Sequence, residues 1–273
     1  MTKRTQAEKA ADFRALHERQ QPFLIPNPWD RGSALILESM GFEALATTSL
    51  GVANMLGQSG VTLQQVLDNC REICEVTRLP VNVDLENCFA DDPREAAKAI
   101  RLACECGAAG GSIEDSTGDA KKPIYDFNLA VERVQAAVEV AKSLPVPFML
   151  TARAENFLHG RRDMDDTIRR LQAFEAAGAD VLYAPGLHSL EEIRTVTCPL
   201  AKPFNLVMGF ADPAITLEQL GAAGVRRVSI GGGLSRVALK AFMDAAREMR
   251  AGRFGFITAM APIGELRGAF RRD

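Results

Sequence analysis

Three short stretches decide the fold expected for this chain: VNVDLE at residues 81–86, GSIEDS at 111–116 and MLTARAE at 149–155. Each starts with apolar residues and ends on charged side chains. In a (β/α)8 barrel, active sites form at the C-terminal ends of the strands. Carboxylates gathered there with one arginine predict a divalent cation and an anionic substrate. The charged residues just past the strand interiors are Asp84, Glu86, Glu114, Asp115, Arg153 and Glu155.

Apolar runs of this kind recur along the chain, separated by amphipathic helical stretches. Strand–helix alternation repeated eight times predicts one α/β domain over residues 1–273, folded as a (β/α)8 TIM barrel. An open doubly wound sheet is the alternative, weakened because no G-x-G-x-x-G motif follows the first strand. The predicted strands are FLIP (23–26), EALATT (43–48), VNVDL (81–85), GGSIE (110–114), FMLTA (148–152), DVLYA (180–184), FNLVM (204–208) and RVSI (227–230).

Composition limits the possible functions. The net charge of −3 over 273 residues does not suggest a nucleic-acid partner. No apolar run is long enough to span a membrane, and the charged N-terminal stretch lacks the apolar core of a signal peptide. The six cysteines show no zinc-site spacing with histidine, so we expect reduced, mostly buried thiols in a cytoplasmic protein. Cys88 stands apart because it follows the VNVDLEN strand end.

The chain continues beyond the eighth strand–helix unit with RFGFITAMAPIGELRGAF (253–270). Its large apolar residues would form an exposed patch on a monomer, which soluble monomers rarely carry. We expect residues 253–273 to be a C-terminal helical extension at the subunit interface of a homodimer or homotetramer. The alternative is that this segment folds back over the N-terminal face of its own barrel.

Three carboxylates are candidate metal ligands. Asp84 and Glu86 alternate along one strand end, so both can point to the same side, and Glu114 ends the next strand. Hard oxygen ligands that converge on one mouth suit Mg²⁺ or Mn²⁺. The alternative is that these side chains only cap helices or lie in solvated loops.

Other strand-end residues are candidates for binding an anionic substrate. The guanidinium of Arg153 can clamp a carboxylate in a fork geometry, unless it only pairs with Glu155. Asn205 lies inside the seventh strand, where an amide needs partners, and we expect it to hydrogen-bond the substrate. Thr48 and Ser49 end the second strand and offer hydroxyl and N–H groups to an anion.

Five motifs together resemble the isocitrate lyase / phosphoenolpyruvate mutase superfamily. The resemblance implies a Mg²⁺-dependent TIM barrel that acts on small 2-oxo or 2-hydroxy acids and stabilises an enolate of pyruvate or a relative. It also implies a C-terminal helix exchanged between subunits. The motifs are TTSLG (47–51), PVNVDLEN (80–87), GGSIEDS (110–116), TARAE (151–155) and FNLVMG (204–209), in the order and spacing of that superfamily.

The matching positions imply roles for the metal and catalytic residues. Asp84 would bind the metal directly, whereas Glu86 and Glu114 would act through metal-bound water. Arg153 would hold the substrate, and Arg153 and Glu114 are the residues expected to act in catalysis.

The resemblance also assigns the substrate carboxylates. Thr48, Ser49 and Leu50 would lie along the segment whose backbone N–H groups cradle one carboxylate. Asn205 would bind a carboxylate as in the lyase branch of the superfamily.

Three departures from the superfamily pattern concern the reaction itself. The loop STGDAKKPIYDF (116–127) has no Cys or His, so the general acid of the isocitrate and methylisocitrate lyases is missing. Gly60 stands where the family often has Asp, which weakens a phosphomutase assignment. The acidic residue usual after the sixth strand is replaced near Pro185, leaving Tyr183 and His188 as candidates for a different substrate contact.

We therefore expect a Mg²⁺-dependent carbon–carbon bond lyase acting on a small 2-oxo or 2-hydroxy dicarboxylic acid. Decarboxylation of an oxaloacetate-like acid needs no Cys loop, so it ranks beside 2-methylisocitrate-type cleavage. The alternatives are a phosphoenolpyruvate or phosphonopyruvate mutase, and a barrel that binds a keto acid without catalysis.

Overall fold

The computed structural model describes residues 4–271; residues 1–3 and 272–273, the latter two at the end of the predicted extension, lie outside the described part. Within that part, eight parallel strands form one sheet in the order β1-β8-β7-β6-β5-β4-β3-β2. The outermost strands meet where the Ala46 N–H donates to the carbonyl of Pro26 over 3.0 Å. The α/β TIM barrel is thereby confirmed. Its strands are β1 (Phe23–Leu24), β2 (Leu45–Ala46), β3 (Val81–Val83), β4 (Gly110–Glu114), β5 (Met149–Arg153), β6 (Val181–Tyr183), β7 (Phe204–Val207) and β8 (Val225–Ser229).

Helices connect the strands, and all the α-helices of the described part except α6, α10 and α11 begin at a capping side chain. Thr62 and Thr216, for example, each accept a bond from the backbone N–H of a glutamine three residues on, and each glutamine bonds back. The helices are α1 (Gln6–Glu18), α2 (Arg31–Ser39), α3 (Ser49–Leu56), α4 (Leu63–Val76), α5 (Pro93–Glu105), α6 (Phe127–Ser143), α7 (Met164–Ala177), α8 (Leu190–Thr197), α9 (Leu217–Ala222), α10 (Gly233–Arg250), the 3₁₀ turn η1 (Gly255–Ala259) and α11 (Ile263–Phe270). None of these helices of residues 4–271 is long and apolar enough to cross a membrane.

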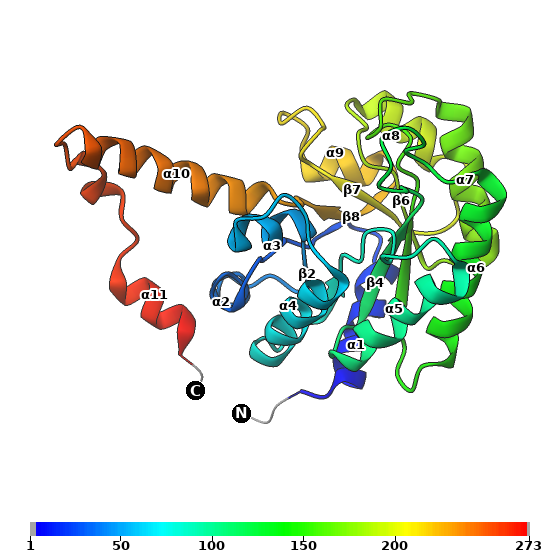
Figure 1. Cartoon of the computed structure of the whole chain (residues 1–273), viewed down its shortest axis with the longest axis horizontal. Helices are drawn as coiled ribbons and strands as arrows, with labels where there is room; N and C mark the ends of the chain where they lie inside the picture. Colours follow the sequence, from blue (N-terminus) through cyan, green and yellow to red (C-terminus); the bar gives the residue numbers. More distant parts are fainter. Residues whose placement is uncertain (1–3, 272–273) are drawn as a thin grey trace.

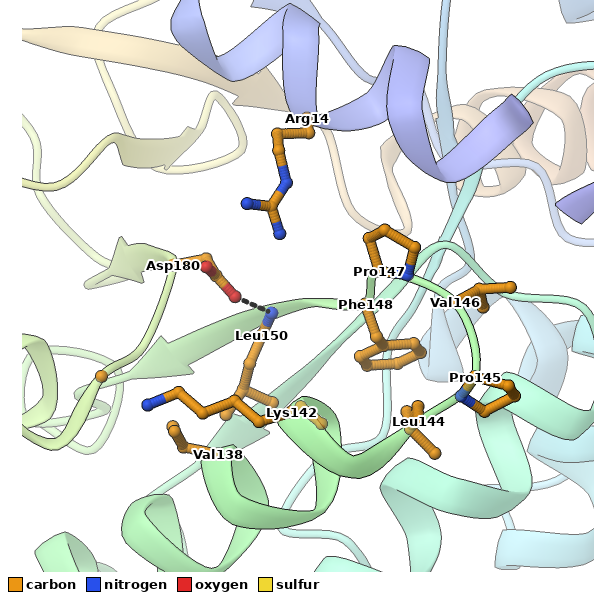
Figure 2. A pocket seen from close by; sticks show the side chains of 12 residues that line it. Arg14, Val138, Lys142, Leu144, Pro145, Val146, Pro147, Phe148, Leu150 and Asp180 are labelled. Atoms are coloured by element: carbon orange, nitrogen blue, oxygen red, sulfur yellow. Dashed lines mark hydrogen bonds between the residues drawn. The ribbon is translucent and has the colours of Figure 1, made fainter. Parts of the chain in front are cut away.

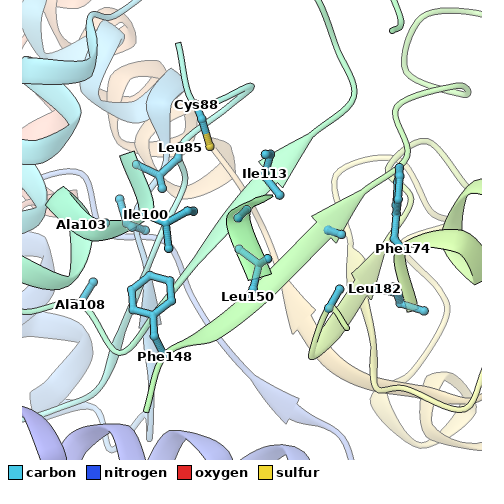
Figure 3. Packing of buried hydrophobic residues seen from close by; sticks show 14 of the residues in the cluster. Leu85, Cys88, Ile100, Ala103, Ala108, Ile113, Phe148, Leu150, Phe174 and Leu182 are labelled. Atoms are coloured by element: carbon cyan, nitrogen blue, oxygen red, sulfur yellow. The ribbon is translucent and has the colours of Figure 1, made fainter. Parts of the chain in front are cut away.

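The main hydrophobic core lies between the strands and the surrounding helices (Figure 3). Ile113 of β4 and Leu150 of β5 are fully buried there, in one cluster with Ile100 of α5. Neighbouring residues of a strand face opposite sides. Ser112 and Thr151 therefore point into the barrel, where a second, polar layer can form.

The N-terminal helix α1 closes the N-terminal end of the barrel. Phe13 is fully buried in a second cluster with Met149 and Val181, which belong to β5 and β6. His17 lies in the same place, with its ring edge-on to Phe13 at a centroid distance of 4.7 Å. The barrel floor is thus made of aromatic and aliphatic side chains.

His17 is neutral in this floor. Its Nδ1 lies 2.7 Å from the carbonyl of Phe13, which can only accept, so Nδ1 carries the proton. Its Nε2 lies 3.3 Å from Nη1 of Arg227 and accepts from it. Burial, and then the charge of Arg227, lower the pKa of His17 from 6.5 to about 3.

Acid should therefore destabilise the protein through His17. Below its ordinary pKa of 6.5 the unfolded chain binds a proton that the folded chain refuses. From this group alone we expect a loss of about 2 kcal/mol between pH 7 and pH 5. His17→Gln keeps an acceptor for Arg227 but cannot titrate. Urea unfolding at pH 7 and pH 5 measures the free energy of unfolding of both proteins. The wild type should lose about 2 kcal/mol more than the variant between the two pH values. An equal loss in both proteins would contradict the assignment.

The C-terminal segment leaves the barrel as an arm, formed by α10, η1 and α11 (Figure 1). Phe242 of α10 is 70% exposed and Ile263 of α11 is 66% exposed. In the described part of the chain, the arm contacts its own barrel chiefly through α10 against α3 and α11 against α2. Folding back over the N-terminal face, the alternative for this segment, is wrong, because α1 occupies that face.

Candidate active site

A small polar cavity lies at the C-terminal ends of the strands, and every strand or the residue just after it contributes to its wall. Its volume is about 60 Å³. All eight strands meet at this end of the barrel, so residues far apart in sequence share one space. The cavity is lined by Ile25, Asn27, Ala46, Thr47, Thr48, Asn82, Asp84, Ser112, Thr151, Arg153, Tyr183, Asn205, Arg227, Ser229 and Gly231.

A larger cavity of about 530 Å³ lies at the opposite end, between α1 and the loop before β5 (Figure 2). Arg14 and Lys142 reach it from α1 and α6. Its one carboxylate, Asp180, accepts the backbone N–H of Leu150 over 2.9 Å. Barrel enzymes carry out their chemistry at the C-terminal face, so we take the smaller cavity as the candidate active site.

Arg153 is the centre of the site. Its Nη1 lies 3.0 Å from Asp84, its Nη2 lies 3.1 Å from Glu114, and its Nε lies 2.8 Å from Glu155. Its guanidinium also lies over the ring of Tyr183, 4.8 Å from the centroid. The fork is therefore held rigidly by carboxylates from the ends of β3, β4 and β5. Arg153 lies in the cavity wall, and its pairing with Glu155, the alternative considered for this residue, is also present.

Burial and neighbouring charges raise the pKa of Glu114 and Glu86. Burial is the largest cause for Glu114, whose pKa lies well above its usual value although Arg153 opposes the shift; Glu155, Asp84 and Glu86 add to it. The pKa of Glu86 is also raised, first by burial and then by Asp84. One arginine does not balance this much negative charge, so the cluster favours an additional cation.

Asp84 is fixed by the segment after β2. Its Oδ2 accepts from the backbone N–H of Ser49 over 3.1 Å and also from the Ser49 hydroxyl. Its own N–H donates to the hydroxyl of Thr47 over 2.9 Å. Ser49 is the first residue of α3, where N–H groups have no partner within the helix and favour a carboxylate. The N-terminus of α3 thus holds the predicted metal ligand.

The three residues predicted to bind a substrate carboxylate, Thr48, Ser49 and Leu50, have different surroundings in this structure. Thr48 lines the cavity and caps α3 by accepting the Gly51 N–H over 3.3 Å. Ser49 is engaged by Asp84, so its N–H does not at the same time face a substrate. The side chain of Leu50 points away from the cavity and lies against Gly232.

The donor set suits a hard cation, but not a preformed cage. Among the described residues, no three His, Cys, Asp or Glu side chains are close enough together to hold a metal ion by themselves. Arg153 lies between Asp84 and Glu114. Carboxylate oxygens are the ligands that Mg²⁺ prefers, and Mg²⁺ usually keeps several waters. Direct binding by Asp84, with Glu86 and Glu114 reaching water molecules, fits this spacing.

Asn205 is oriented by two neighbours on β8. Its Oδ1 accepts from Nε of Arg227 over 2.8 Å, and its Nδ2 donates to the hydroxyl of Ser229 over 3.1 Å. The amide oxygen is therefore occupied, and the remaining amide hydrogen is the group that Asn205 can offer to a substrate. That hydrogen suits a carboxylate.

Of the remaining candidate residues, Tyr183 lines the cavity, whereas His188, Cys88 and Asp115 do not. Tyr183 lines the cavity, and burial raises the pKa of its hydroxyl, which stays protonated. His188 is exposed and bonds the carbonyl of Phe210, outside the cavity wall.

Cys88 is buried behind the site with its pKa raised to about 12 by burial, so it is an inert thiol. Asp115 faces α7 and pairs with Arg170 over 3.0 Å.

Several cavity residues were not predicted from the sequence. Most of them are polar residues inside a strand, whereas Asn27 follows β1 and Ser229 ends β8. Polar side chains at alternate strand positions were the available signal, since those positions share one face. In a barrel strand that face is the interior. The missed residues are Asn27, Asn82, Ser112, Thr151, Arg227 and Ser229.

Known proteins share this architecture. The profile of the family described as phosphoenolpyruvate phosphomutase matches residues 13–250. The chain is 30% identical to 2-methylisocitrate lyase of Escherichia coli (strain K12), covering 78% of this chain and 75% of that protein. It is 27% identical to oxaloacetate decarboxylase of Chromohalobacter salexigens, covering 88% and 84% of the two chains. A solved structure from Burkholderia cenocepacia J2315, described as a candidate lyase/mutase, is 52% identical with a TM-score of 0.95, covering 98% and 97%.

The family match spans most of the chain, and it includes the strand ends that carry Asp84, Glu114, Arg153 and Asn205. The chain therefore belongs to the phosphoenolpyruvate phosphomutase family and is an enzyme of the isocitrate lyase / phosphoenolpyruvate mutase superfamily, a superfamily of lyases and mutases acting on keto acids.

Proposed function

We propose that this protein is a Mg²⁺-dependent carbon–carbon bond lyase that acts on a small 2-oxo or 2-hydroxy dicarboxylic acid and forms an enolate. The observation that carries the proposal is the Arg153 cluster, in which three carboxylates surround one guanidinium at the edge of a small polar cavity. A 2-oxo acid can bind a cation through its carboxylate and carbonyl oxygens. Arg153 can then stabilise the charge that develops when the neighbouring carbon–carbon bond breaks.

Each residue of the site has a role in this proposal. Asp84, Glu86 and Glu114 would hold the cation, which would supply electrostatic stabilisation of developing negative charge. Asn205 donates its free amide hydrogen to a substrate carboxylate. Tyr183, which burial keeps protonated, is a hydrogen-bond donor on the cavity wall.

Decarboxylation of an oxaloacetate-like acid is the reaction we favour. The loop after β4 forms a closed turn, with Ser116 bridged to Ile124 and Lys122 paired with Asp126 over 2.8 Å. It contains no Cys or His, so it supplies no general acid of the isocitrate lyase kind. Loss of CO₂ from a 3-carboxylate needs no such acid, because the departing group takes no proton.

The assembly and setting belong to the same proposal. We place the arm at the interface of a homodimer or homotetramer, because its apolar side chains are exposed on one chain. The six cysteines are free thiols, which supports a cytoplasmic setting. Single-domain organisation with residues 253–273 as an extension completes the description.

A substrate screen tests the function. Oxaloacetate, methylisocitrate, isocitrate, phosphonopyruvate and phosphoenolpyruvate are each incubated with the protein and Mg²⁺, and pyruvate, glyoxylate and phosphate are assayed. We expect pyruvate from oxaloacetate, lost on adding EDTA and restored by excess Mg²⁺. Phosphate release, or interconversion of the phosphorus compounds, would favour the mutase branch. Binding of keto acids without turnover of any would favour the non-catalytic alternative.

A further inference from the structure

The buried arginines of this protein differ in how their charge is balanced. Arg153 pairs with three carboxylates, and Arg170 pairs with two aspartates. Arg133 donates to three backbone carbonyls. Arg227, which is only 3% exposed, forms no ion pair in residues 4–271. Arg133 also lacks an ion pair in this part of the chain, but three carbonyl oxygens accept from it, whereas Arg227 has two oxygen acceptors. A buried guanidinium without an anion is costly, so Arg227 needs an explanation.

The partners of Arg227 are all neutral. Its Nε donates to Asn205 Oδ1 over 2.8 Å, its Nη2 donates to the hydroxyl of Thr151 over 2.9 Å, and its Nη1 lies 3.3 Å from the neutral ring of His17. Each terminal nitrogen therefore keeps a second hydrogen. Burial lowers the pKa of Arg227 to about 9, so the side chain is still cationic at neutral pH. An anion would offset its lost hydration.

The position of Arg227 depends on an irregularity in the sheet. The pairing of β7 with β8 slips by one residue after Phe204, so that Asn205 lies opposite Arg227. Such bulges often re-aim a side chain beside an active site. Here the slip places the guanidinium inside the barrel, on the wall of the active-site cavity.

The cavity consequently has two chemically different sides. On one side, Asp84 follows β3 and lines the cavity, and Glu114 at the end of β4 reaches it through Arg153. On the other side, Asn205 and Arg227 belong to β7 and β8, which lie across the barrel in the strand order. One side suits a cation that binds the 2-oxo acid group. The other offers N–H donors and a positive charge.

We propose that Arg227 binds the second anionic group of the substrate and so selects dicarboxylic over monocarboxylic 2-oxo acids. This inference rests on the proposed function, because it assumes that the first carboxylate binds on the side of Asp84. It adds a specificity-determining residue on β8, with Asn205 and Thr151 holding the guanidinium in place.

The test compares two ligands of similar size. Malate and 2-hydroxybutyrate are both four-carbon 2-hydroxy acids, but malate carries a second carboxylate where 2-hydroxybutyrate has a methyl group, and calorimetry in the presence of Mg²⁺ gives the dissociation constant of each. We expect Arg227→Met to reduce the preference for malate over 2-hydroxybutyrate by roughly 10–100-fold, the range for a charge-assisted hydrogen bond. The affinity for 2-hydroxybutyrate should change by less than about threefold, and Arg227→Lys should recover part of the preference.

The matched control is Arg226→Met. Arg226 is the neighbouring strand residue, does not line the cavity, and donates to the carbonyl of Val225. Its replacement should leave the preference unchanged. If Arg227→Met fails to fold by circular dichroism, Arg227→Gln gives the same comparison, because it removes the charge but stays polar.

The outcomes separate the two proposals. A wild-type preference that survives in Arg227→Met or Arg227→Gln overturns the inference and leaves the proposed function standing. A wild-type protein that binds neither acid with Mg²⁺ overturns both.

Discussion

Replacing Asp84 with alanine is expected to lower kcat/KM about 10³-fold or more and to weaken Mg²⁺ binding strongly. A divalent ion contributes several kcal/mol to stabilising developing charge, and each factor of ten in rate corresponds to about 1.4 kcal/mol. Arg153 keeps Glu114 and Glu155 as partners in the variant, so the change leaves no unpaired buried cation. The fold should therefore persist while activity is lost.

The measurements are titration calorimetry with Mg²⁺ and turnover of oxaloacetate. Asp180→Asn is the matched control, because Asp180 lies in the large cavity at the other end of the barrel, and an amide can still accept the Leu150 N–H. We expect that control to stay within about threefold of the wild type. Unchanged Mg²⁺ affinity in Asp84→Ala would show that the metal assignment is wrong.

Deleting residues 253–273 is expected to convert a dimer or tetramer into a smaller species. Burying one large apolar side chain is worth roughly 1.5–3 kcal/mol. The deletion removes Phe254, Ile257, Met260, Ile263 and Phe270, each at least 44% exposed on a single chain. Losing three such contacts would raise the dissociation constant by at least about 10³-fold.

Light scattering at micromolar concentration measures the mass of each form. Phe242→Glu, on the exposed face of α10, should act in the same direction as the deletion. Leu102→Glu is the control, because Leu102 is a partly exposed apolar residue of α5, which packs against α4 and α6. A full-length protein that is already monomeric would end the assembly hypothesis.

The strands and the charged strand ends could be read from the sequence because both are local properties. Apolar runs bounded by helices defined the eight strands, and β4 was located to the residue. Asp84, Glu114 and Arg153 were recognised because they directly follow such runs. The parallel fold then necessarily brings those ends to one face of the barrel.

The partners of these side chains were decided only by the tertiary structure. Whether Arg153 meets one carboxylate or three, and whether the Ser49 N–H faces substrate or Asp84, depends on how neighbouring strands are staggered. The sequence shows Asn205 in a strand but not that its oxygen is taken by Arg227.

Arg227 is the clearest example of a site residue whose position only the tertiary structure decided. The predicted eighth strand starts at this residue, whereas β8 begins two residues earlier, at Val225. Its place inside the barrel follows from the slip between β7 and β8 and from closure that brings Thr151, 76 positions away, within 2.9 Å. The sequence alone determined that this is a barrel with charge at one end. Only closure of the barrel decided which charges meet, because the pairing of distant strands is a property of the whole sheet and not of any one segment.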